Sequence, residues 1–218
     1  MVNGGLSALG REAVKRLNRY GVVIDVSQLS TKSLLQTIKL STAPVIASHS
    51  AVRALINETR NLSDMELDAI AANGGVVHVP PFNSYIAPRP RIVKKLAGEL
   101  RQKYGLPAEF QSLLDDMVVI STKDGNYTYD FAKGMPRASV DDYVDHIDYI
   151  VDRIGIDHVG IGTDFNHASG IPGYADESEA INVTHTLLKR DYTAEEIKKI
   201  WSGNFMRVFE AVEHAAKK

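Results

Sequence analysis

The chain has 218 residues, a net charge of −2 at neutral pH, 44% hydrophobic and 24% charged residues, and no cysteine. These values are typical of one folded domain with a substantial core, and they exclude a long disordered chain. The balanced charge gives no electrostatic case for nucleic acid as a partner. Without cysteine, disulfides and thiolate metal sites are excluded, so any metal would need His, Asp or Glu ligands.

The N-terminal region has no apolar signal core, and no window approaches the ~20 apolar residues of a membrane span. We therefore expect a protein with no membrane span. The expected location of the chain as written is the cytoplasm.

Helical and strand-like segments alternate along the chain. Short apolar, β-branched runs predict strands covered on both faces, and apolar residues at helical spacing predict the helices between them. Ser63 and Glu66 form a capping box, and Ser139 is a candidate N-cap. The expected strands are 22–27, 44–50, 75–81 and 158–165. The expected helices are 10–21, 30–41, one from the capping box at Ser63 to 74–75, 91–105, 107–117, 139–155, 177–191 and 193–218, the last with a break at 202–203.

Four strands, each followed by a helix, predict an α/β fold with a parallel sheet. Four such βα units could form a small doubly wound sheet or half of a (β/α)8 barrel. Residues 81–138 interrupt the alternation, and we interpret them as a lid-like helical and loop excursion. The whole chain, residues 1–218, is expected to be a single domain.

In both architectures, the polar groups at the carboxyl ends of the strands face the ligand crevice. The main candidates here are His49, which ends the run APVIASHS, and Asp164, which follows GIGT. A neutral imidazole is a good zinc ligand, and a carboxylate in the same pocket can bind metal or move protons. The alternative is that both are structural polar groups at loop starts. Asp25, Gln28, residues 80–83 and Asn166 lie at corresponding strand ends.

Three further residues have competing interpretations. Arg60 precedes a helix and could clamp a carboxylate with two hydrogen bonds, although a plain surface arginine fits the spacing as well. His78 lies inside a strand, which favours packing over metal ligation. His167 is followed by a loop sequence, which favours exposure.

Five segments together resemble the renal-type (membrane) dipeptidase family, zinc metallopeptidases of the amidohydrolase superfamily. The segments are GLSALGREAVKRLNRYGVVIDVSQLS, PVIASHSAVRAL, TRNLSDMELDAIAANGGVV, VDDYVDHIDYIVDRIGIDHVGIGTDFN and GNFMRVFEAVE. The resemblance is collinear over nearly the whole chain except 81–138. It covers the second half of the family's (β/α)8 barrel, about strands five to eight.

The resemblance implies dipeptide hydrolysis at a dinuclear zinc centre. By motif position it makes His49 a zinc ligand and Asp164 the catalytic acid and base. The resemblance also implies that Arg60 binds the carboxylate of the substrate and that Tyr85 lines the substrate pocket. The implied substrate is a small peptide or a related amide.

The chain also departs from the family pattern. The family has Asp-Leu-Ser-His where this chain has Asp25-Val26-Ser27-Gln28, so a neutral amide replaces a zinc-ligating histidine. It has Asp-Phe-Asp-Gly where this chain has Asp164-Phe165-Asn166-His167, which suggests a different substrate. The family's His-x-Asp zinc pair and bridging glutamate belong to the barrel's first half.

We therefore expect a fragment, a split-gene half or a truncated product, with little zinc binding or activity of its own. A complementary N-terminal half-barrel, or another copy in a homo-oligomer, could complete the barrel. Two alternatives remain open. One is a non-catalytic ligand-binding or assembly protein that retains the scaffold, and the other is a mononuclear metal hydrolase using His49 and Asp164.

Overall fold

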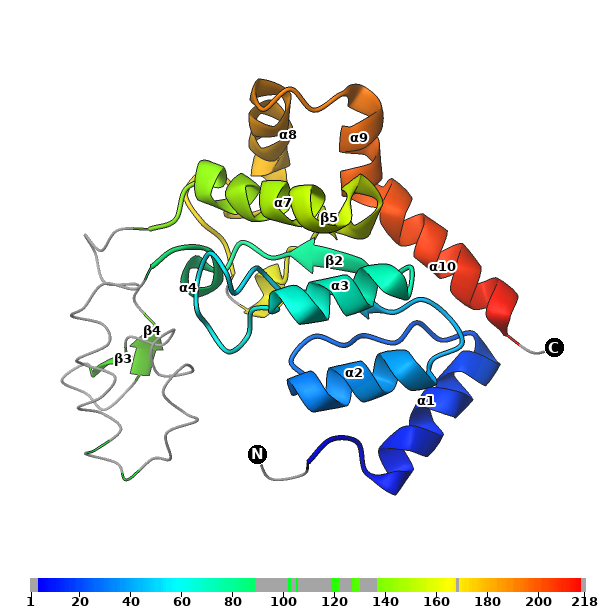
Figure 1. The fold of residues 1–218 in the computed structure, drawn as a ribbon. Helices are drawn as coiled ribbons and strands as arrows, with labels where there is room; N and C mark the ends of the chain where they lie inside the picture. The colour runs from blue at the N-terminus through cyan, green and yellow to red at the C-terminus, as the bar shows by residue number, and fades with distance from the viewer. Residues whose placement is uncertain are drawn as a thin grey trace.

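A three-stranded parallel sheet forms the centre of the fold in this computed structural model, which describes residues 4–88, 102, 105, 119–121, 127–129, 137–167 and 169–216 (Figure 1). The strand order is β1–β2–β5, with Ile46 opposite Val76 and His78 opposite Gly160. Its strands are β1 (Ile46–Ala47), β2 (Val76–Val79) and β5 (Val159–Ile161). The predicted mixed α/β class and parallel sheet are confirmed.

The expected strand at 22–27 forms only a single parallel bridge, between Asp25 and Ile46. The backbone N–H of Val26 donates to the Ile46 carbonyl at 2.7 Å, which begins a regular ladder. The ladder stops because the Asp25 carboxylate, not a backbone carbonyl, accepts the N–H of Ser48 at 3.0 Å. An acidic side chain at the strand end thus replaces the pairing that would have lengthened this strand.

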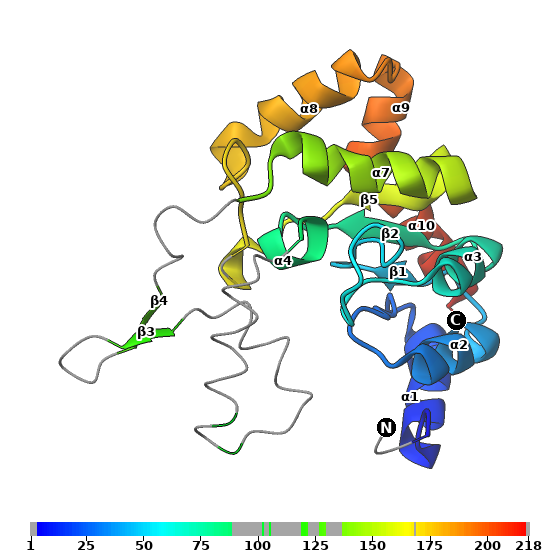
Figure 2. The same ribbon diagram turned by 60° about the vertical axis from the view of Figure 1, so that its left-hand side comes forward.

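The two faces of the sheet are covered by different helices. Val77 and Val79 pack into the main core with α3 (Asp64–Ala72) and α7 (Val140–Ile154). Val76 points the other way and packs against Val208 and Val212 of α10 (Asn204–Ala215). Figure 2 shows α10 drawn behind α3 in the view turned by 60°. Alternate residues of one short strand therefore face two helical layers, as its continuous apolarity predicted.

The remaining helices surround this centre. Helices α1, α2 and α3 lie next to one another in chain order, and α8 packs against α7. Among the described residues, no helix has the length and apolarity needed to cross a bilayer. The further elements are α1 (Ala8–Tyr20), α2 (Thr31–Leu40), α4 (Asn83–Ile86), α8 (Ala180–Lys189), α9 (Ala194–Lys198), α10 (Asn204–Ala215), an antiparallel pair of β3 (Val119–Ser121) and β4 (Tyr127–Tyr129), and 3-10 turns at Ile156–His158, Phe165–His167 and Glu177–Glu179.

Helix starts follow the capping signals in the sequence. The backbone N–H of Ser63 donates to Glu66 at 2.8 Å ahead of α3, and Ser139 caps α7. The helices expected over 91–105 and 107–117 lie outside the described residues, apart from 102 and 105.

The expected break at 202–203 is instead a π-helical turn, Lys199–Gly203, between α9 and α10. The chain stays helical through this segment, which forms one wider, π-helical turn. Asn204 fixes its end, because its amide donates to the carbonyls of Ile156 (2.6 Å) and Val159 (2.8 Å). This anchoring holds the start of α10 against β5.

Candidate functional site at the strand ends

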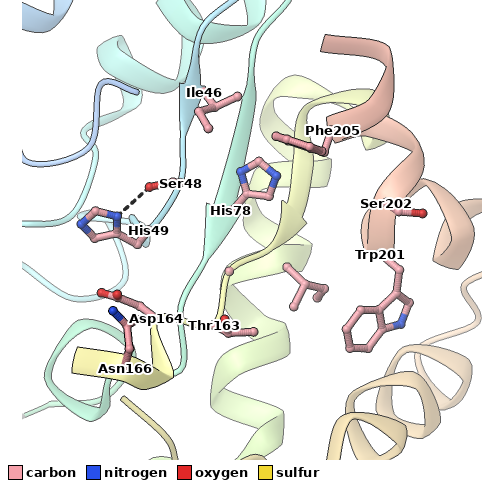
Figure 3. A pocket seen from close by; sticks show the side chains of 12 residues that line it. Ile46, Ser48, His49, His78, Thr163, Asp164, Asn166, Trp201, Ser202 and Phe205 are labelled. Carbon is pink, nitrogen blue, oxygen red and sulfur yellow. Dashed lines mark hydrogen bonds between the residues drawn. The ribbon is translucent and has the colours of Figure 1, made fainter. Parts of the chain in front are cut away.

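A cavity of about 450 Å³ opens between the carboxyl ends of the strands and the π-helical turn. Figure 3 shows His49 and Asp164 on its strand-end side and Phe205 with Trp201 on its helical side. The lining residues are Ile46, Ser48, His49, His78, Ile161, Gly162, Thr163, Asp164, Asn166, Trp201, Ser202 and Phe205. The structure therefore brings the two main sequence-predicted residues to one cavity with a polar and an apolar side.

His49 is held by hydrogen bonds at both ring nitrogens. Its Nδ1 lies 2.7 Å from the hydroxyl of Ser48, and its Nε2 lies 2.7 Å from the amide nitrogen of Gln28. The backbone N–H of His49 donates to the Ser27 hydroxyl at 3.1 Å. The ring orientation is therefore fixed by residues of the two adjacent strand ends.

Asp25 accepts hydrogen bonds from three donors behind His49. Its Oδ1 accepts the backbone N–H of Ser27 at 2.9 Å and of Ser48 at 3.0 Å. Its Oδ2 accepts the Ser48 hydroxyl at 2.5 Å. Burial raises the pKa of Asp25, but the hydrogen bonds from Ser48 and Ser27 outweigh burial, so the pKa lies below its usual value. Asp25 is thus a carboxylate at neutral pH.

Gln28 and Asp164 both have left-handed backbone conformations, with φ of 64° and 51°. Such angles cost free energy for residues other than glycine, and they concentrate at functional sites. The side chain of Asp164 is 18% exposed, and its Oδ1 lies 2.8 Å from Nδ1 of His167. His167 itself is 71% exposed, as expected from its loop sequence.

His78 lines the cavity with a buried ring and is not one of its exposed polar groups. Its ring is buried and makes an edge contact with Phe205, with centroids 5.8 Å apart. Burial lowers the pKa of His78. The hydrogen bond to the Ala47 carbonyl and the charge of Asp25 raise the pKa, but they are weaker than burial. A Cβ at residue 160 would lie 2.5 Å from the ring, so glycine at Gly160 makes room for it. The packing interpretation of His78 agrees with this geometry.

Arg60 and Tyr85 do not line this cavity. Arg60 is half-buried in the loop between β1 and α3. Tyr85 is 5% exposed on α4, and its ring packs against Phe82 with centroids 5.0 Å apart. Both residues follow strands at the same edge of the sheet as His49.

The described residues do not by themselves fit a metal centre. No group of three or more His, Asp or Glu side chains among them is arranged to hold an ion. A His-x-Asp string does occur, His146-Ile147-Asp148, but on helix α7 and not at a strand end. His146 accepts the Val52 N–H at 3.0 Å, and Asp148 binds Arg190 at 2.5 Å. This string is therefore structural.

Sequence reasoning missed the helical side of the cavity, formed by Trp201 and Phe205. These aromatic residues are four positions apart, and they flank the Ser202-Gly203 pair that suggested a helix break. Aromatic residues one turn apart beside a glycine are a weak signal, because they are common in ordinary cores. The indole N–H of Trp201 donates to the Thr184 hydroxyl at 2.9 Å, which fixes the ring.

A parallel sheet with polar groups at the carboxyl ends of its strands defines an α/β protein with a ligand site at that edge. The profile of the membrane dipeptidase family (peptidase family M19) matches residues 1–218. The chain belongs to this family, which confirms the resemblance seen in the sequence. Membership of a metallopeptidase family implies a metal cofactor.

Several relatives share the family. Dipeptidase tcpJ of Claviceps purpurea is 30% identical over 216 residues, which are 99% of this chain and 40% of that protein. An uncharacterized dipeptidase of Schizosaccharomyces pombe, C965.12, is 29% identical, and the match covers 97% of this chain and 41% of the relative. The chain thus spans about two fifths of the length of these relatives.

Solved structures share the fold. The probable dipeptidase PvdM from Pseudomonas aeruginosa is 40% identical with a TM-score of 0.84, and the match covers 99% of this chain and 56% of that one. A Rhodobacter sphaeroides metallo peptidase liganded with a phosphinate mimic of L-Ala-D-Ala has a TM-score of 0.72 at 24% identity, covering 96% of this chain and 48% of that one. The second likeness shows the fold alone.

Proposed function

We propose that the chain forms half of a (β/α)8 barrel and contributes one side of a zinc-dependent dipeptidase site. The site would hydrolyse the peptide bond of dipeptides or related small amides. The observation that carries this proposal is that His49 and Asp164 line one cavity at the carboxyl ends of parallel strands. Membership of the membrane dipeptidase family supports the reaction class. The match to only 56% of the PvdM chain supports the half-barrel.

Each site residue has a proposed role. His49 is a metal ligand through its ring, and Asp164 is the acid and base that moves the proton of the reaction. Arg60 binds the substrate's carboxylate and Tyr85 lies beside the substrate, as the family pattern assigns. Both follow the strand ends at the edge of the sheet where His49 emerges, which supports a shared site.

The remaining metal ligands would come from outside the described residues. Gln28 donates to His49 Nε2 and occupies the position of a usual zinc ligand, so the described part of the chain would bind zinc weakly. A complementary N-terminal half-barrel, or a second copy of the chain, would supply the other ligands. In this proposal, residues 1–218 are one domain, and 81–138 are a lid-like excursion inserted in its sequence.

A non-catalytic role is the second candidate. It is favoured by the contact between Gln28 and His49, because both ring nitrogens already have hydrogen-bond partners within the chain. In that case, the cavity would bind a small ligand or mediate assembly without hydrolysis.

Bound zinc and dipeptide hydrolysis would distinguish the candidates. We would measure both for the purified chain, alone and mixed with the N-terminal half of the 40% identical Pseudomonas aeruginosa relative. Zinc and activity that appear only in the mixture support the proposed dipeptidase site. Two tightly held zinc ions in the chain alone would contradict the need for a second half. Neither zinc nor activity in either sample would favour the non-catalytic role.

A further inference from the structure

Four side chains form one continuous series of hydrogen bonds at the strand ends. In order they are Asp25, Ser48, His49 and Gln28, and the successive distances are 2.5, 2.7 and 2.7 Å. The two middle members of the series, Ser48 and His49, line the cavity. Figure 3 shows the contact between the Ser48 hydroxyl and the His49 ring.

The direction of each bond follows from the number of protons available. The Asp25 carboxylate has only acceptors, so the Ser48 hydroxyl must donate its single proton to Oδ2. Ser48 Oγ can then only accept from the ring, which requires a proton on Nδ1 of His49. This holds whichever atom of the Gln28 amide faces the ring. The neutral imidazole therefore carries its electron pair on Nε2.

We propose that Asp25 is a positioning residue that fixes the Nδ1–H tautomer and the ring orientation of His49 through the Ser48 hydroxyl. Nε2 of His49 thereby carries the electron pair of the ring, and this electron pair accepts a hydrogen bond from the amide of Gln28. Asp25 is itself held in place, because its Oδ1 accepts two backbone N–H groups. This inference concerns the chain without metal and stands independently of the proposed dipeptidase function.

The same two backbone bonds make a sharp substitution test. In Asp25→Asn, the carbonyl oxygen would keep the N–H groups of Ser27 and Ser48, because the amide nitrogen cannot accept them. The amide nitrogen would then stand where Oδ2 was and donate to Ser48. Ser48 would in turn donate to Nδ1 of His49, so the tautomer would reverse to Nε2–H. Ser48→Ala would instead remove the constraint without reversing it.

Ser50 provides a matched control on the other side of His49. Its side chain is buried, and its hydroxyl has no hydrogen-bond partner in the described part of the chain. Ser50→Ala therefore removes the same atom, one residue from His49, without touching the series. Ser48→Thr is the conservative rescue, because it keeps a hydroxyl at the same position.

The experiment is long-range ¹H–¹⁵N NMR of histidine rings in mildly alkaline buffer, where imidazoles are neutral. The His49 signals are assigned by their loss in His49→Gln, and backbone spectra verify that each variant is folded. We expect protonated Nδ1 in the natural chain, Ser48→Thr and Ser50→Ala, and protonated Nε2 in Asp25→Asn. The tautomer ratio in Ser48→Ala should shift by about tenfold, as loss of an ordinary hydrogen bond predicts. Protonated Nε2 in the natural chain, or no difference between Asp25→Asn and Ser50→Ala, would overturn the proposal.

Discussion

The amide nitrogen of Gln28 lies 2.7 Å from Nε2 of His49, where a metal would approach the ring. Two imidazole nitrogens on one tetrahedral zinc lie roughly 3–3.5 Å apart, so the spacing at this position suits a second ligand. The left-handed φ of 64° at residue 28 is one that histidine tolerates better than most residues.

Gln28→His is therefore expected to raise the zinc affinity of the chain, by about an order of magnitude or more. Zinc titration by calorimetry would measure it. Gln28→Asn is the matched control, because asparagine also tolerates this backbone but adds no imidazole. The gain should disappear when His49→Ala is added to Gln28→His. An unchanged affinity in Gln28→His would argue against a metal role for His49.

Asp164→Asn is expected to lower the kcat of the completed barrel by about 10²–10⁴, the usual contribution of a general acid or base. Asparagine tolerates the left-handed φ of 51° at this position, so the free energy of unfolding should change little. Asp191→Asn is the matched control, because Asp191 has a φ of 63° but lies outside the cavity. Dipeptide hydrolysis and urea unfolding of both variants are the measurements. Equal activity of both variants would remove the proposed role of Asp164.

Local sequence patterns predicted the helices near the site well. The apolar spacing and the capping residues Ser63 and Ser139 depend on neighbours within four positions, and the structure confirms the helices they begin. The order of strand and helix also predicted that His49 and Asp164 would share one edge of a parallel sheet.

Other features depend on contacts that are distant in the sequence. The run 22–27 has strand composition, but the Asp25 carboxylate captures the Ser48 N–H 23 residues away and ends the ladder. Trp201 and Phe205 line the cavity within and just after the π-helical turn that stands in place of the expected break. The roles of Arg60 and Tyr85 stay predictions, because they depend on where a substrate would lie.

His146→Gln is expected to flatten the dependence of stability on acid pH. Burial lowers the pKa of His146 to about 4. The hydrogen bond to the Ile86 carbonyl and the charge of Asp145 act in the opposite direction but are weaker than burial. The unfolded chain, with a histidine pKa near 6.5, binds more protons than the folded chain between these values. The contribution of His146 to the free energy of unfolding is therefore fully present above about pH 6.5. It is lost as the pH falls towards 4, by up to about 3 kcal/mol.

Urea unfolding of the natural chain and His146→Gln at several pH values would test this. Glutamine can still accept the Val52 N–H, so the variant should fold, and it should lose part of the acid slope. The exposed His214 gives the control His214→Gln, which should keep the full slope. Parallel acid slopes for the natural chain and His146→Gln would contradict the prediction.

Asn204→Ala is expected to destabilise the fold by about 2–4 kcal/mol, because it leaves one buried and one partly buried carbonyl without their donor. The side chain is 2% exposed and donates to the carbonyls of Ile156, in the turn before β5, and of Val159, the first residue of β5. Phe205, which lines the cavity, follows Asn204 directly in the chain, so the variant should also loosen the helical side of the site. Asn182→Ala, which removes one half-buried bond to the Gly173 carbonyl, should cost only about 1 kcal/mol. Equal urea midpoints for the two variants would show that Asn204 does not anchor α10 to the sheet.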